Sequence, residues 1–197
     1  MNRRALILAA GAVSLVPARV AADQDAGVIE AAQGEAVVFG PPERALWPAA
    51  SVFVGDEVVT GATGRLAMLL GGQTRVLMGE ATRLTIDRFL VDSGGEFTLG
   101  DGAMIFDRPE DAPRTPVSVV SQFGQIAVRG TRFFAGPSRG VFAIFVFRGE
   151  VLVTAGGQEL VLPVGFGTEI AVPGGPPDAP LQWGEGRIAE ALASVAF

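Results

Sequence analysis

Most of the side chains that carry enzyme chemistry are missing from this 197-residue sequence, which has no His, Cys, Lys or Tyr, so that all 15 basic residues are arginines. Without imidazole, thiol, amine or phenol, the chain cannot build Ser-His-Asp or Cys-His nucleophiles, a Schiff-base lysine, or zinc sites made of His and Cys. Carboxylates are the remaining candidates. A series of them runs from residue 87 to residue 107: Asp87, Asp92, Glu96, Asp101 and Asp107.

Two carboxylates about 5 to 10 Å apart are the catalytic equipment of glycosidases. Acids at such positions usually occupy turns and wet strand faces, and we expect that placement here. The series contains no Asp-x-Asp-x-Asp-Gly calcium loop, and Asp101-Gly102 alone predicts only a turn. The sequence therefore predicts no enzyme activity, no cofactor and no metal site.

Two arginines, Arg129 and Arg132, flank Gly130 and offer a different chemistry. The planar guanidinium group can hold a carboxylate through two parallel hydrogen bonds. A binding role for this pair competes with the commoner situation, in which such arginines are solvated or pair with a nearby acid of their own chain.

The elements that must position these residues are short strands. Between residues 34 and 172, runs of β-branched, leucine and phenylalanine residues alternate with glycines, and no helical period persists, which predicts an all-β domain. Gly71-Gly72 and Gly156-Gly157 predict tight hairpins, and residues 147–150 predict a turn or bulge. The spacing fits either a two-layer sandwich or a solenoid-like stack of hairpins, and no strict repeat decides between them.

Residues 141–147 are apolar on both faces of the predicted strand. Side chains alternate across a strand, so Val141, Ala143, Phe145 and Phe147 share one face, and Phe142, Ile144 and Val146 share the other. A strand of this kind must be covered on both sides. We therefore expect it in a central position with a second layer over it.

Two proline-rich stretches and one helix complete the plan. Residues 107–116 contain three prolines and predict a loop, and residues 173–184 predict a Pro/Gly linker. Within residues 185–197, Ile188, Leu192 and Val195 recur at helical spacing. This pattern favours a short terminal helix that caps the core over a helix that docks a partner.

The first residues predict export. Arg3 and Arg4 precede an apolar stretch and a small-residue site, so residues 1–22 are expected to be a signal peptide that is cleaved before Asp23. The apolar stretch is too short to remain as a membrane span. General secretion is favoured over the twin-arginine route, although Arg3-Arg4 leaves the latter open. A chain without cysteine gains no stability from disulfides, and a bacterial periplasm fits best.

Removing the three arginines of the first 22 residues changes the formal net charge from −6 to −9. A surface this acidic disfavours nucleic acids and anionic lipids as partners, because both bind through basic groups that neutralise phosphates. A hydrophobic fraction of 49% excludes a disordered chain. The predicted divisions are therefore residues 1–22, an N-terminal segment 23–33, a β domain 34–172, the linker and the helix.

Several motifs within residues 34–172 resemble the FecR domain, a domain of bacterial envelope proteins. The first half carries Val54-Gly55-Asp56-Glu57-Val58-Val59-Thr60 and the hairpin at residues 71–77. The second half carries Val128-Arg129-Gly130-Thr131-Arg132-Phe133 and residues 146–151. The resemblance implies an exported all-β domain that contacts other proteins or envelope components. FecR-type regulators also place a sigma-factor-binding region and a membrane helix before this domain, and residues 1–33 are too short for both.

The motif residues are expected to serve the fold rather than a ligand. Gly130 would permit a bulge or a close backbone approach, Thr131 would satisfy a backbone group there, and Phe133 would fill the core. Asp56 would stabilise the turn at Gly55. The complete set of motif residues is Gly55, Asp56, Thr60, Arg129, Gly130, Thr131, Phe133 and Gly149.

The function expected from the sequence is a non-catalytic binding module that contacts another envelope protein through a sheet surface or a strand edge, with signalling as a candidate role. The alternative is a carbohydrate- or peptidoglycan-binding domain. Sugar-binding faces stack aromatic rings on the sugar, and the chain offers two tryptophans, Trp47 and Trp183.

Overall fold

The computed structural model describes residues 24–90, 94–112, 115–128 and 130–197. The expected signal peptide with its cleavage site, together with Asp92 and Arg129, lies outside these residues. Two nine-stranded sheets make up most of the described chain, and a single helix follows them. Of the residues described, none belong to a helix long and apolar enough to span a bilayer.

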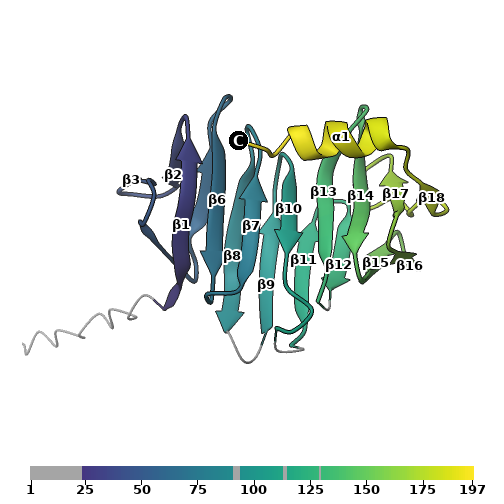
Figure 1. Cartoon of the computed structure of the whole chain (residues 1–197), viewed down its shortest axis with the longest axis horizontal. Coiled ribbons are helices and arrows are strands. Elements are labelled where there is room, and N and C mark those ends of the chain that lie inside the picture. The colour runs from purple at the N-terminus through teal and green to yellow at the C-terminus, as the bar shows by residue number, and fades with distance from the viewer. Residues whose placement is uncertain (1–23, 91–93, 113–114, 129) are drawn as a thin grey trace, which may run out of the picture.

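Sheet A has the helix on its outer face (Figure 1). Its strands, in spatial order, are β18 (Leu181–Gln182), β17 (Phe166–Ile170), β14 (Val141–Arg148), β13 (Arg132–Ser138), β10 (Met104–Asp107), β7 (Thr74–Met78), β6 (Arg65–Leu70), β1 (Asp25–Gln33) and β4 (Ser51–Phe53).

Sheet B packs against sheet A. Its strands, in spatial order, are β16 (Gln158–Pro163), β15 (Glu150–Ala155), β12 (Gly124–Val128), β11 (Val117–Ser121), β9 (Gly94–Leu99), β8 (Arg83–Leu90), β5 (Glu57–Thr60), β2 (Ala36–Val38) and β3 (Arg44–Ala45).

The path of the chain combines the two architectures that the sequence left open. The hairpins β6–β7, β8–β9, β13–β14 and β15–β16 lie alternately in sheet A and sheet B, and the chain advances along the sandwich as it alternates (Figure 1). Because β10 crosses to sheet A between β9 and β11, these two strands pair in parallel, unlike the antiparallel hairpins. The fold is therefore an all-β sandwich that is wound like a solenoid.

Aromatic rings run through the centre of the core between the sheets. Phe97, Phe106 and Phe133 are fully buried, and successive ring centroids lie 6.1 and 5.6 Å apart in tilted arrangements. Such pairs add about 0.5–1.5 kcal/mol each beyond the burial of their area. Phe133 thus fills the core, as the sequence predicts.

A second apolar cluster covers the outer face of sheet A beneath helix α1 (Glu185–Ala193). It includes Phe134, Phe145 and Trp183, with Ile188, Leu192 and Val195 against them; we call it the helix cluster. The helix therefore caps the domain, as predicted. Strand β14 has Phe142, Ile144 and Val146 in the inner core and Ala143 and Phe145 under the helix, so both of its faces are covered.

Strand β1 extends the domain further toward the N-terminus than the predicted division. Residues Asp25–Gln33 pair with both β4 and β6, within the stretch that the sequence sets apart as segment 23–33. Small residues dominate this strand, which is why the usual strand signal is weak there. In the linker, β18 pairs with β17, and Asp107 of the expected loop is the last residue of β10.

Candidate functional site

The two most specific FecR-like motifs meet at one rim of the sandwich. Residues 128–133 lead from β12 in sheet B to β13 in sheet A, and residues 146–151 return from β14 to β15. Gly149, with φ +78°, lies so close to this first crossing that a Cβ atom there would stand 2.8 Å from Thr131 Cγ2. Glycine is therefore required at Gly149 both by conformation and by space.

Gly130 and Thr131 form the crossing itself. Gly130 has φ +64°, whereas a Cβ atom there would meet nothing nearer than 3.6 Å, so conformation rather than close approach explains this glycine. Thr131 is fully buried, yet its Oγ1 has no hydrogen-bond partner among the described residues. The expected satisfaction of a backbone group comes instead from the Thr131 carbonyl, which accepts from the Arg108 N–H at 2.9 Å.

The motif of the first half also has structural roles. Gly55 has φ +94°, and the Asp56 carboxylate accepts from the Phe53 N–H at 2.9 Å, which stabilises the turn as predicted. Asp56 also binds Arg44 at 2.5 Å. The Thr60 hydroxyl is buried, donates to the Gly79 carbonyl at 2.6 Å and accepts from the Thr82 N–H at 2.9 Å.

Strand register places a row of charged residues across the outer face of sheet A. Asp107 of β10 lies directly opposite Arg75 of β7 on one side and Arg132 of β13 on the other, and Arg132 lies opposite Arg148 of β14. Directly opposed residues in neighbouring strands are close enough for their side chains to interact. We call Arg75, Asp107, Arg132 and Arg148 the charged row.

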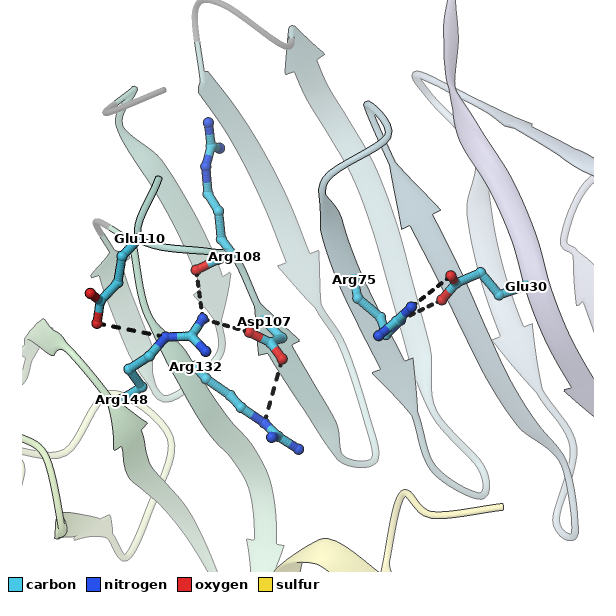
Figure 2. A network of polar contacts seen from close by, with 7 residues as sticks. All are labelled: Glu30, Arg75, Asp107, Arg108, Glu110, Arg132 and Arg148. Carbon is cyan, nitrogen blue, oxygen red and sulfur yellow. Dashed lines mark hydrogen bonds and ion pairs between the residues drawn. The ribbon is translucent and has the colours of Figure 1, made fainter. Parts of the chain in front are cut away.

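Asp107 is the centre of this row (Figure 2). Its carboxylate accepts from Arg148 Nη2 at 2.7 Å and lies 3.6 Å from Arg132 Nε. Arg148 Nη2 also donates to the Arg108 carbonyl at 2.9 Å, and Arg148 Nε stands 3.9 Å from Glu110. Arg132 thus pairs with an acid of its own chain, which is commoner for such an arginine than binding the carboxylate of a ligand. Its guanidinium group also lies over the Phe147 ring.

Arg75 forms the other end of the row by binding Glu30 of β1 with two hydrogen bonds, at 2.5 and 2.8 Å (Figure 2). Hydrogen bonding to Arg75 lowers the pKa of Glu30, and the same bonds raise the pKa of Arg75. Both groups are therefore held in their charged forms.

An open groove of about 460 Å³ lies beside the charged row. Arg75, Asp107 and Arg148 line it together with Gln73 of the β6–β7 turn and Asp111 of the loop after β10. The groove presents both signs of charge, with hydrogen-bond donors and acceptors that are already oriented by their mutual contacts. Such a surface suits another protein surface of mixed charge better than a small apolar ligand.

The other acids singled out from the sequence do not join Asp107. Asp87 and Glu96 belong to sheet B, where Asp87 accepts from Thr98 Oγ1 at 2.8 Å and Glu96 pairs with Arg88 at 3.8 Å. Asp101 is exposed in the turn before β10. Within the described ranges, no group of three or more acids could hold a metal ion.

The two tryptophans have opposite environments. Trp183 is 6% exposed and stacks on Phe145 with centroids 4.7 Å apart, while the Arg187 guanidinium lies 3.9 Å above the other face of its ring. Both faces of the Trp183 ring are therefore occupied. Trp47, at 59% exposed, is the tryptophan that a sugar could reach.

Sequence reasoning did not single out Arg75, Glu30 or Arg148 as members of a site. Arg148 lies in a recognised motif and Arg75 follows a predicted hairpin, but no sequence signal states that β7, β10, β13 and β14 are neighbours. The charged row exists only through that order of strands.

Comparison with known proteins finds one matching family model and a similar fold. Residues 56–152 match the model of the family described as FecR protein. Two crystal structures of a candidate anti-sigma factor from Parabacteroides distasonis resemble the fold, with TM-scores of 0.57 and 0.56 at 15% sequence identity. Each comparison covers 68% of this chain and 62% of the solved one, so the chain spans less than two thirds of those proteins. No curated protein matches the sequence.

Proposed function

Because the chain contains a FecR-like domain, we propose that it is an exported, non-catalytic binding module of the bacterial envelope that contacts another envelope protein. The groove beside the charged row is the observation that carries this proposal. It is open, it is lined by oriented charges of both signs, and it lies at the end of sheet A where the two FecR-like motifs meet.

A role in signalling is part of the proposal and rests on two similarities. The family match covers the motifs that form the rim, and the solved structures of similar fold are those of a candidate anti-sigma factor. In this role the domain transmits the presence of a partner by binding it.

Site-specific crosslinking tests the groove. A photoreactive residue in place of the exposed Gln73 should capture one envelope protein in cells, and the additional substitution Asp111→Arg should abolish the capture by reversing a charge in the lining of the same groove. A photoreactive residue in place of Arg88, exposed on sheet B, is the control and should capture nothing above background. Equal capture from both positions, or none from Gln73, contradicts the proposal.

Periplasmic location is proposed from the expected signal peptide and has its own test. Fractionation should place the protein with periplasmic markers, and sequencing of the mature N-terminus should begin at Asp23. A cytoplasmic protein that retains Met1 would contradict export while leaving the domain assignment intact.

Binding of peptidoglycan or another carbohydrate is the second candidate, and the exposure of Trp47 favours it. If sugar stacks on this ring, adding peptidoglycan fragments should change the tryptophan fluorescence of the wild-type protein but not that of Trp47→Ala. An unchanged wild-type signal at saturating glycan would remove this candidate.

A further inference from the structure

The two sheets end very differently at the C-terminal end of the sandwich. Along β17, the Asp178 N–H donates to the Glu169 carbonyl at 2.9 Å, Thr168 Oγ1 donates to the Asp178 carbonyl at 2.6 Å, and β18 pairs with residues 166 and 167. The proline-rich segment before β18 thus covers the edge of sheet A, as expected for a protected edge.

Among the residues that the structure describes, no segment pairs with the outer edge of β16 at the end of sheet B, and β15 is its one strand partner. Strand β16 has six residues, compared with two or three in each of the other terminal strands, β3, β4 and β18. A long exposed edge is a template for pairing with another strand.

The hairpin register shows which backbone groups this edge presents. Ala155 and Gln158 flank the two-residue turn at Gly156-Gly157 and form a hydrogen-bonded pair, so Gln158, Leu160 and Leu162 direct their backbone groups to β15. Glu159, Val161 and Pro163 direct theirs outward. In the described part of the chain, the N–H groups of Glu159 and Val161 have no hydrogen-bond partner.

Side chains alternate in the same way. Leu162 is buried in the core and Leu160 packs against it, whereas Val161 is 50% exposed on the outer face. An added strand would therefore need apolar residues on the inner side, next to Leu160 and Leu162. It would also need an uncharged residue beside Val161 and no acid opposite Glu159.

We propose that β16 pairs with β16 of a second copy of this chain, antiparallel and centred on Val161, so that the two B sheets become continuous. In this register each Val161 N–H donates to the Val161 carbonyl of the other copy. Each Glu159 N–H donates to the Pro163 carbonyl, which suits proline because it has a carbonyl but no N–H.

The same register satisfies the side-chain requirements. Leu160 lies opposite Leu162 of the second copy and extends the apolar inner face, the two Val161 side chains meet on the outer face, and Glu159 faces Pro163 rather than another Glu159. The strand is thus complementary to itself in charge and in hydrogen bonding. This self-pairing is independent of the envelope partner proposed above.

Cysteine crosslinking tests the register directly, because the chain has no cysteine of its own. Opposed residues in a hydrogen-bonded antiparallel pair have Cα atoms about 5.5 Å apart, within the range that a disulfide spans. Val161→Cys should therefore form a covalent dimer under mild oxidation. Glu159→Cys is the matched control, since its Cα atom would lie roughly 13 Å from its counterpart and should stay monomeric.

Backbone substitution tests the hydrogen bonds. Val161→Pro removes an outward N–H without removing a bond to β15, so it should halve the mass seen by sedimentation at high concentration while circular dichroism stays native. Val161→Thr keeps the N–H and should remain dimeric. The proposal is overturned if Val161→Cys gives no more dimer than Glu159→Cys, or if the wild-type chain sediments as a monomer and is unaffected by Val161→Pro.

Discussion

The outer face of sheet A contains two neighbouring regions on the same strands, one apolar and buried and the other charged and accessible. Within β13 and β14, the paired residues Phe134 and Phe145 are buried with Trp183 under α1 as the helix cluster. Two or three residues further along, at the first residue of β13 and the last of β14, Arg132 and Arg148 belong to the charged row, which faces an open groove. A single strand thus changes from a structural surface to an accessible one within a few residues.

The two regions also differ in the interactions that hold their side chains in place. The helix cluster is held by the burial of apolar area, which added salt does not screen. The charged row is held by ion pairs between partly exposed groups, which contribute little to stability and weaken as salt screens them. We therefore expect substitutions in the helix cluster to affect mainly stability, and substitutions in the charged row to affect mainly binding.

The largest expected effect is that of Trp183→Ala. It removes a ring that is stacked between Phe145 and Arg187, and should lower the free energy of unfolding by about 3 kcal/mol in urea titrations. Trp47→Ala, at an exposed position, should change it by less than about 0.5 kcal/mol. Similar losses from the two substitutions would show that α1 does not stabilise the sheet.

The next largest loss of stability is expected at Gly149, which lies against Thr131 at the rim of the sandwich. Gly149→Ala forces a left-handed conformation on alanine and brings its Cβ against Thr131, so we expect a loss of about 2 kcal/mol in thermal or urea unfolding. The control is Gly157→Ala, which has a similar φ of +75° but open space around it and should cost about 1 kcal/mol. Equal losses of unfolding free energy from the two substitutions would mean that the contact between the added Cβ and Thr131 is unimportant.

Asp107→Ala should separate stability from binding. The substitution leaves Arg132 and Arg148 without their shared carboxylate, and because these groups are partly exposed the cost should be only about 1 kcal/mol. Capture through position 73 should nevertheless be lost. The exposed Asp87→Ala is the control and should affect neither measurement. Unchanged capture with Asp107→Ala would remove the charged row from the binding site.

The smallest effects should appear with pH. Glu30 of the charged region and Glu190 of the helix region each bind an arginine, Arg75 and Arg139, and hydrogen bonding to that arginine lowers both carboxyl pKa values. A lowered folded-state pKa gives stability that is present above the unfolded pKa and is lost as pH falls through the folded value. Carboxyl titration by NMR should therefore show both midpoints below the usual glutamate value, and higher salt should raise them. Midpoints that are normal at low salt would contradict these pairs.

Much of the local structure could be predicted because its causes are local. The glycine pairs at 71–72 and 156–157 form the expected hairpins, and the two apolar faces of residues 141–147 are both covered. The helix over Glu185–Ala193 follows from the spacing of Ile188 and Leu192. In each case the residues that specify the element lie within a few positions of one another.

The tertiary structure alone decided which of these elements are neighbours. Asp107 and Arg148 are 41 residues apart, and their contact depends on β10, β13 and β14 lying side by side in register. Trp183, in a predicted linker, is buried because α1 folds back over Phe145. Periodicity and turn residues act within a strand or hairpin, so the sequence by itself determined the hairpins, their two-sided strands and the chemistry that the chain lacks. The pairing of the charged residues was determined by packing between strands that are distant in the sequence, because no local pattern encodes which of these strands are neighbours.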